Sequence, residues 1–130
     1  MKKLIFLSIF ITVIIIITGC DSDNKHFKLK IKESRWSDSM ENYKPKEVTN
    51  EYDVVLGKKY NINSGNLVFE VEKINANSIV IKTEEVFSDS KKGINLNSKK
   101  KIFKIYINKE TKLTTLTMDA GEIYYLKLTK

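Results

Sequence analysis

Apolar and polar side chains alternate along much of the chain from residue 26 onward. In residues 26–33, Phe27, Leu29 and Ile31 take every second position, and lysines stand between them. A period of two places the two sets on opposite faces of a β-strand, so the pattern predicts a strand with one buried face. Alternation or β-branched runs predict further strands at residues 51–56, 58–62, 67–74, 78–85, 101–108, 112–118 and 121–128.

Turn-forming residues separate these segments. The sequences NSGN at 63–66 and NANS at 75–78 flank residues 67–74. Asn, Ser and Gly favour tight turns, so residues 67–74 and 78–85 are predicted to pair as a hairpin. Around Gly57 the chain forms either two short strands or one bent strand.

Two segments do not alternate. In residues 34–46, apolar side chains lie three to four positions apart before Pro45, which predicts a short helical turn or an irregular crossover. Residues 88–100 form a polar, lysine-rich loop. Seven or so short strands with turns at regular intervals, and no long amphipathic helix, predict one all-β domain over residues 27–130, folded as an antiparallel β-sandwich or barrel.

The chain begins with a different pattern, in which Lys2 and Lys3 precede an apolar stretch over residues 4–17. A basic start, an apolar run and small residues are typical of a helical signal peptide. A retained transmembrane helix is the alternative, but about 15 residues are short for a bilayer core that needs about 20. Asp21 and Asp23 prevent extension of the run.

The tetrapeptide Ile17-Thr18-Gly19-Cys20 closes this run and resembles the lipobox of bacterial lipoproteins. The resemblance implies cleavage between Gly19 and Cys20 and a diacylglycerol thioether on Cys20, which becomes the mature N-terminus. Two acyl chains are sufficient for stable anchoring. We therefore predict a signal peptide over residues 1–19, a lipidated cysteine and tether over 20–26, and a location on the extracytoplasmic face of the cell membrane.

A second, local resemblance lies in Met118-Asp119-Ala120-Gly121-Glu122-Ile123-Tyr124. Its spacing is similar to the turn before the tyrosine corner of fibronectin type III and other immunoglobulin-like sandwiches. The resemblance implies an immunoglobulin-like sandwich and a Tyr124 hydroxyl that bonds back to the backbone. Ala120 replaces the usual proline, and the paired cysteines of those families are missing.

The charged residues bear on which class of partner the protein binds. The chain has 23 basic and 16 acidic residues, for a formal charge of +7, and loss of Lys2 and Lys3 with the signal peptide leaves +5. All basic residues except Arg35 are lysines, a bias that AT-rich codons would also produce. Arginine is the preferred residue for bidentate phosphate recognition, so its scarcity and the export signal argue against nucleic acid.

One cluster of lysines is a candidate polyanion site. It comprises Lys91, Lys92, Lys99, Lys100 and Lys101. Lysines near a charged surface contribute about 1 kcal/mol each, so the cluster is predicted to contact anionic headgroups or wall polymers. A solvated hairpin tip is the alternative.

The chain offers few residues for catalysis or metal binding. Cys20 and His26 are its only cysteine and histidine, which excludes an intramolecular disulfide and a nucleophile paired with histidine. Glu70, Glu72 and the pair at 84–85 are expected on the solvated surface. We predict no enzymatic activity, no cofactor and no metal.

Trp36, Tyr43, Tyr52 and Tyr60 form either an exposed aromatic platform or part of the core, with Trp36 expected in the core. Together these patterns predict a membrane-anchored lipoprotein of the cell envelope that acts as a non-catalytic binding module for a protein, peptide or envelope polymer. The alternative is a structural or accessory subunit of an envelope complex.

Overall fold

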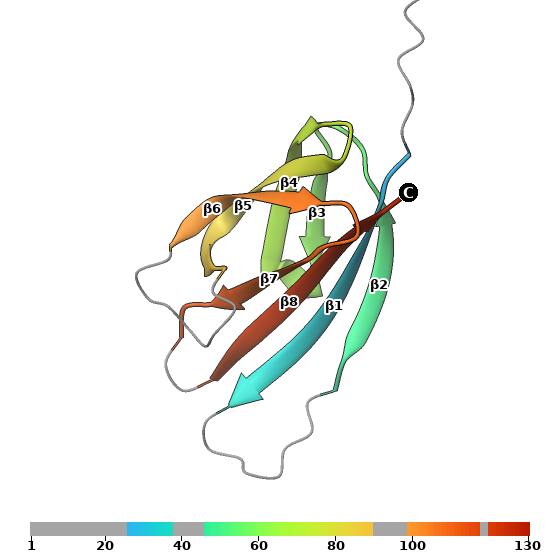
Figure 1. The fold of residues 1–130 in the computed structure, drawn as a ribbon. Coiled ribbons are helices and arrows are strands. Elements are labelled where there is room, and N and C mark those ends of the chain that lie inside the picture. Colours follow the sequence, from blue (N-terminus) through green and yellow to red (C-terminus); the bar gives the residue numbers. More distant parts are fainter. Residues whose placement is uncertain (1–25, 38–45, 90–98, 118–119) are drawn as a thin grey trace, which may run out of the picture.

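Eight strands make up most of the chain that the computed structural model describes, residues 26–37, 46–89, 99–117 and 120–130 (Figure 1). The strands are β1 (Lys28–Ser37), β2 (Val48–Asp53), β3 (Lys59–Ile62), β4 (Leu67–Ile74), β5 (Ser78–Ser88), β6 (Lys100–Tyr106), β7 (Glu110–Thr115) and β8 (Ala120–Thr129), with a short 3-10 helix η1 (Asn63–Gly65) between β3 and β4. Within those ranges no helix has the length and apolar character needed to cross a bilayer.

The strands form one antiparallel sheet in the order β2-β1-β8-β7-β5-β4-β3, with β6 also paired to β5. The sheet curls so that its two halves face each other (Figure 1). The predicted all-β, antiparallel, sandwich-like fold is therefore confirmed. Because one continuous ladder links all eight strands, the arrangement differs from the two separate sheets of an immunoglobulin domain.

The core lies between the two halves of the sheet and follows the alternation in the sequence. Phe27, just before β1, and Leu29 and Ile31 on β1 are buried, while the lysines between them face outward. The remaining buried apolar side chains are Tyr60, Ile62, Leu67, Phe69, Val71, Ile79, Ile81, Phe87, Phe103, Ile105, Leu113, Tyr124, Leu126 and Leu128. Each such side chain contributes about 1.5–3 kcal/mol relative to exposure, so the alternating pattern determines which face of each strand packs inward.

Strand β1 is longer than predicted. Residues 34–37 were expected in a helical turn or crossover, but they continue β1 and pair with residues 120–123 of β8. The helix-like spacing after residue 34 was misleading. The backbone N–H and C=O groups of these residues find their hydrogen-bond partners on β8, and a local sequence pattern contains no information about that distant strand. Residues 38–45 lie outside the described ranges.

The pairing of β1 with β8 defines two ends of the molecule. Lys28 lies opposite Thr129, and Ser37 lies opposite Ala120. We call the first the entry end, because the chain enters the domain there, and the second the far end. Nine steps of about 3.3 Å separate them, so the two ends lie about 30 Å apart along β1.

The curled sheet has a seam, because β2 and β3 stand at opposite ends of the strand order. In a closed barrel, backbone hydrogen bonds would join these two strands; here the side chain of Tyr60 bridges them. The Tyr60 hydroxyl donates to the Asp53 carbonyl at 2.5 Å and accepts from the Val55 amide at 3.1 Å. Its ring stacks on Phe69 at 5.0 Å, which anchors the bridge in the core.

Candidate functional site

A cleft of about 560 Å³ opens at the far end, where β1 ends, β8 begins and β7 ends. Its lining includes Arg35, Trp36, Thr115, Thr117, Gly121 and Glu122. We call it the Trp36 cleft. Its volume is within the range of about 300–1,000 Å³ that is usual for small-molecule sites.

Gly121 makes room for the indole of Trp36. The two residues are direct partners on adjacent strands. A Cβ atom at position 121 would lie 2.8 Å from Trp36 Nε1, 2.6 Å from Thr117 Oγ1 and closer still to Thr115 Oγ1. An aromatic ring lying across a glycine of the neighbouring strand is a known way of covering exposed backbone. The three side chains therefore meet at a spot where only glycine fits.

Trp36 is half-buried and lies outside the core cluster, so the expectation that it belongs to the core was wrong. Its Nε1 atom is shielded from solvent and has no acceptor among the described residues. A buried donor without a partner costs about 1–3 kcal/mol. This cost lies inside the protein, because Nε1 packs against Gly121 and has no surface open to solvent.

Arg35 lies beside Trp36 on β1 and opposite Glu122 on β8. Its side chain is 65% exposed, and Nε lies 3.9 Å from Glu122 Oε1. Among the described residues, Glu122 is the one ion-pair partner of Arg35 within 4 Å. The two terminal amino groups of the fork are therefore available to a ligand, because the guanidinium has five donors in fixed geometry.

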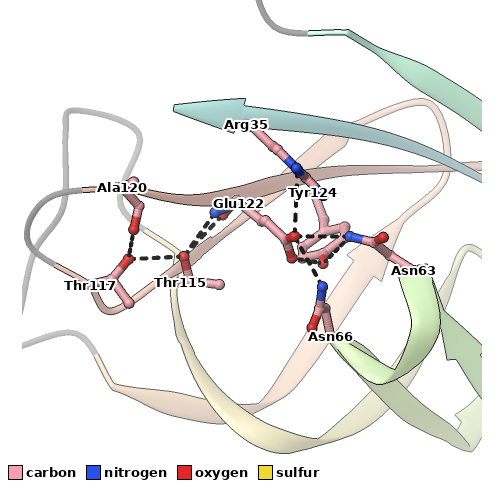
Figure 2. Close-up of polar contacts among 8 residues, drawn as sticks. All are labelled: Arg35, Asn63, Asn66, Thr115, Thr117, Ala120, Glu122 and Tyr124. Carbon is pink, nitrogen blue, oxygen red and sulfur yellow. Dashed lines mark hydrogen bonds and ion pairs between the residues drawn. The ribbon is translucent and has the colours of Figure 1, made fainter. Parts of the chain in front are cut away.

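Glu122 holds the floor of the cleft in place. Figure 2 shows Arg35, Asn63, Asn66 and Tyr124 converging on its carboxylate. Oε1 accepts from Asn63 Nδ2 and Asn66 Nδ2, both at 3.0 Å, and Oε2 accepts from the Tyr124 hydroxyl at 2.5 Å. The side chain is only 16% exposed. These bonds fasten the turn at η1 to β8 and fix the position of the ion pair with Arg35.

The hydroxyl of Tyr124 therefore bonds to side chains. Its partners are Glu122 and, at 3.4 Å, Asn63. Burial, and then the bond to the Glu122 carboxylate, raise the pKa of Tyr124, so the hydroxyl remains a donor at neutral pH. The expected tyrosine corner was wrong, because the acceptor is a side-chain carboxylate two residues away and not the backbone.

A second carboxylate borders the same region. Glu33 lines a smaller hollow of about 330 Å³ beside Arg35, Val48 and Asn63. Burial raises the pKa of Glu33, the charge of Glu122 raises it further, and the Arg35 guanidinium lowers it. Arg35 thus stands between two carboxylates. The lining of the Trp36 cleft contains Arg35 and Glu122, so its net charge is close to zero.

The lysine cluster is only partly within the described ranges. Lys91 and Lys92 lie outside them, while Lys99, Lys100 and Lys101 are exposed at the start of β6. Lys100 donates to Asp89 at 2.6 Å. Phe87 is opposite both Lys100 and Thr115, so the start of β6 lies toward the far end.

The anchor residues Gly19 and Cys20 lie outside the described ranges, and His26 is exposed just before β1. The four carboxylates at 70, 72, 84 and 85 are exposed, as expected of a solvated surface. No group of three or more His, Cys, Asp or Glu side chains within the described ranges is placed to hold a metal ion.

The predicted aromatic platform does not form as one surface. Tyr60 is buried, and Tyr52 packs edge-on against it with ring centroids 6.1 Å apart. Tyr52 lies opposite Leu29, seven residues before Trp36 on β1 and thus about 23 Å away along the strand. Tyr43 lies outside the described ranges.

No protein-family model, curated protein or solved structure matches this chain. The site is therefore defined by geometry alone. Reasoning from sequence missed the roles of Thr115, Thr117, Gly121 and Glu122, which pairing brings to Trp36 from more than 75 positions away. One signal was present: the only arginine of the chain directly precedes its only tryptophan.

Proposed function

We propose that this protein is a lipid-anchored binding module of the cell envelope. Acyl chains on Cys20 hold it at the extracytoplasmic face of the membrane, and it binds its ligand without catalysis in the Trp36 cleft. The motif at residues 17–20 supports the anchor, because it combines an export signal with an attachment point. No metal or cofactor is part of the proposal.

The position of the cleft is the observation that carries this proposal. The cleft opens at the far end, about 30 Å along β1 from the entry end. The tether of residues 21–26 spans at most about 20 Å when fully extended, so the entry end stays close to the lipid. A cleft at the other end opens toward the extracellular side, where a wall or periplasmic ligand would reach it.

The anchor is tested by the intact mass of protein extracted from membranes. Wild-type protein is expected to begin at Cys20 and to carry a diacylglycerol increment, whereas Cys20→Ser is expected to keep residues 1–19 and lack the lipid. Ser22→Ala is the matched control and leaves processing unchanged. A wild-type chain that is soluble and unmodified contradicts the proposal.

An accessory subunit is the second candidate, favoured by the edge strand β2. Five of its six residues are exposed, and among the described strands it pairs only with β1. A free edge can accept a strand from a partner protein. Thr49→Pro removes one backbone donor that faces away from β1, since the bond from the Val54 amide to the Phe27 carbonyl sets 31/50 and not 32/49 as a hydrogen-bonded pair. Loss of a stoichiometric complex from cross-linked membranes of this variant favours the subunit role, and an unchanged complex excludes β2 as its contact.

A further inference from the structure

Two neighbouring apolar residues are exposed at the entry end. Val55 is 50% exposed and Leu56 is 60% exposed. They belong to the segment between β2 and β3, which lies at the same end of the molecule as the C-terminus and the start of β1 (Figure 1). The Val54 amide donates to the Phe27 carbonyl at 2.9 Å, so this segment begins beside the residue that precedes β1. The apolar pair therefore lies where the chain enters the domain.

The backbone presents these side chains on a fixed turn. The Lys58 amide donates to the Val55 carbonyl at 3.2 Å, which closes a turn with Leu56 and Gly57 at its tip. Gly57 has a φ of +76°, as the third position of a type II turn requires. Its amide donates to the Val71 carbonyl on β4 at 2.8 Å, which fastens the turn to the sheet. The exposure of the apolar pair is therefore built into the folded backbone.

A cation stands next to the apolar pair. Lys58 and Lys59 directly follow it and are exposed. Lys59 is paired with Glu84, whereas no carboxylate of the described residues lies within 4 Å of Lys58 Nζ. That ammonium lies 5.1 Å from the centre of the Tyr60 ring. Binding to a membrane interface grows with the buried apolar area and with the attraction to anionic lipids, and this turn offers both.

We infer that the turn at residues 55–58 inserts Val55 and Leu56 into the extracytoplasmic leaflet of an anionic membrane, with Lys58 at the headgroups. The inference rests on the lipid anchor of the proposed function and adds a second contact, made by the folded domain itself. The tether of residues 21–26 spans at most about 20 Å, so the anchor keeps the turn close to the lipid. At such a high effective concentration, a contact too weak to recruit the protein is sufficient to orient it.

The size of the apolar surface favours lipid over a protein partner. Five large apolar side chains are exposed within the described ranges, and only Val55 and Leu56 are neighbours in the sequence. A stable protein interface buries at least about 1,000 Å² in total. Two side chains cannot supply such an area, whereas a bilayer accepts single apolar side chains at its interface.

A tryptophan at the tip of the turn tests the insertion. The double variant Trp36→Phe, Leu56→Trp carries its single indole there, and the lipidated protein is reconstituted into vesicles of phosphatidylcholine and phosphatidylglycerol. Phospholipids brominated on the acyl chains are expected to quench this indole by roughly half or more. Wild-type Trp36, at the far end, is expected to stay nearly unquenched. In vesicles of phosphatidylcholine alone, the quenching at the tip should fall about twofold, because Lys58 then has no anionic headgroup to contact.

Two matched controls separate the turn from general effects. Ala76→Trp, also in the Trp36→Phe background, places the same indole on the exposed turn between β4 and β5 at the same end, and is expected to be quenched far less. Lys58→Glu, added to the tip variant, is expected to reduce quenching about twofold. Lys46→Glu makes the same change of charge beside Arg35 and should leave quenching unchanged. Far-UV circular dichroism confirms that each variant folds.

The inference is overturned if brominated chains quench Leu56→Trp no more than Ala76→Trp, or if Lys58→Glu and Lys46→Glu behave alike. A tip indole that is shielded in detergent, to a degree that depends on protein concentration, would mean that a second copy covers the turn, which also contradicts the inference. Intact mass separates this failure from that of the anchor. A chain without a diacylglycerol increment contradicts the anchor, whereas a lipidated chain whose tip is not quenched contradicts only the insertion.

Discussion

Gly121 is the glycine with the least room for a larger side chain. Gly121→Ala is expected to destabilise the protein by about 1–3 kcal/mol, because its methyl group would collide with Thr115, Thr117 and Trp36. The indole must move to relieve the overlap. Urea unfolding measures the loss of stability, and the native emission of Trp36 is expected to shift in the same variant.

Gly57 provides the matched control. Its φ of +76° disfavours alanine, but no atom lies within 4 Å of an added Cβ. Gly57→Ala is therefore expected to cost about 1 kcal/mol through backbone strain alone and to leave the emission of Trp36 unchanged. Wild-type stability of Gly121→Ala would show that the indole does not lie against this strand.

Glu33 makes stability depend on pH in a defined direction. Because burial and Glu122 raise its pKa in the folded chain, the folded state binds more protons than the unfolded state above the ordinary value of 4.5. The contribution of Glu33 to stability is therefore full below pH 4.5 and is lost as the pH rises through the raised folded value.

Glu33→Gln is expected to stabilise the protein at pH 7 by about 0.5 kcal/mol, the size of a cross-strand charge pair. The gain should vanish below pH 4.5, where the wild-type carboxyl is neutral in both states. Thermal unfolding at a series of pH values measures this. Glu110→Gln, at an exposed position, is the control. If Glu33→Gln still stabilises the protein at acid pH, the destabilisation at pH 7 does not come from the ionised carboxylate of Glu33.

At the scale of elements, the Tyr60 hydroxyl provides two hydrogen bonds at the seam between β2 and β3. Tyr60→Phe keeps the stacking on Phe69 but removes the bridge to Asp53 and Val55. The loss is expected to be about 1–3 kcal/mol, because two backbone groups lose their partner. Tyr106→Phe, at a position 44% exposed, is expected to cost far less.

Amide hydrogen exchange locates the effect of Tyr60→Phe. Faster exchange is expected at Val55 and along β3, while β1 and β8 should retain their protection, since their ladder is intact. Uniformly faster exchange would mean that the hydroxyl stabilises the whole fold and does not close the seam locally.

The elements were largely predictable, because each buried strand needs one apolar face. Residues 67–74 match β4, and the inward side chains of β1 and β8 follow period two. The extension of β1 over residues 34–37 was not predictable, because its partner lies at 120–123. The cleft depends on the same register: Trp36 meets Gly121 only through pairing between residues 85 positions apart, and no local pattern encodes that distance.

At the scale of the whole molecule, the two ends differ in composition. Toward the entry end, the outer face of β1 carries Lys28, Lys30 and Lys32, of which Lys28 pairs with Glu51 at 3.3 Å. Toward the far end, the same face carries Ser34 and Trp36. Lysines near the tether would be attracted to anionic headgroups, so the domain is expected to stand upright on the membrane with its cleft at the opposite end.

This orientation predicts how lipid quenchers act on tryptophan. In proteoliposomes with a quencher attached to the headgroups, Trp36 is expected to keep most of its emission, because it lies about 30 Å along β1 from the tether. In the double variant Trp36→Phe, Thr129→Trp, the single indole is moved to the entry end and should be quenched strongly. The two proteins differ only in where the indole lies, so unequal lipid incorporation is controlled by normalising to the detergent-solubilised emission. Equal quenching of both would mean that the domain lies flat on the membrane, and stronger quenching of Trp36 would place the cleft against the lipid, which contradicts an outward-facing binding site.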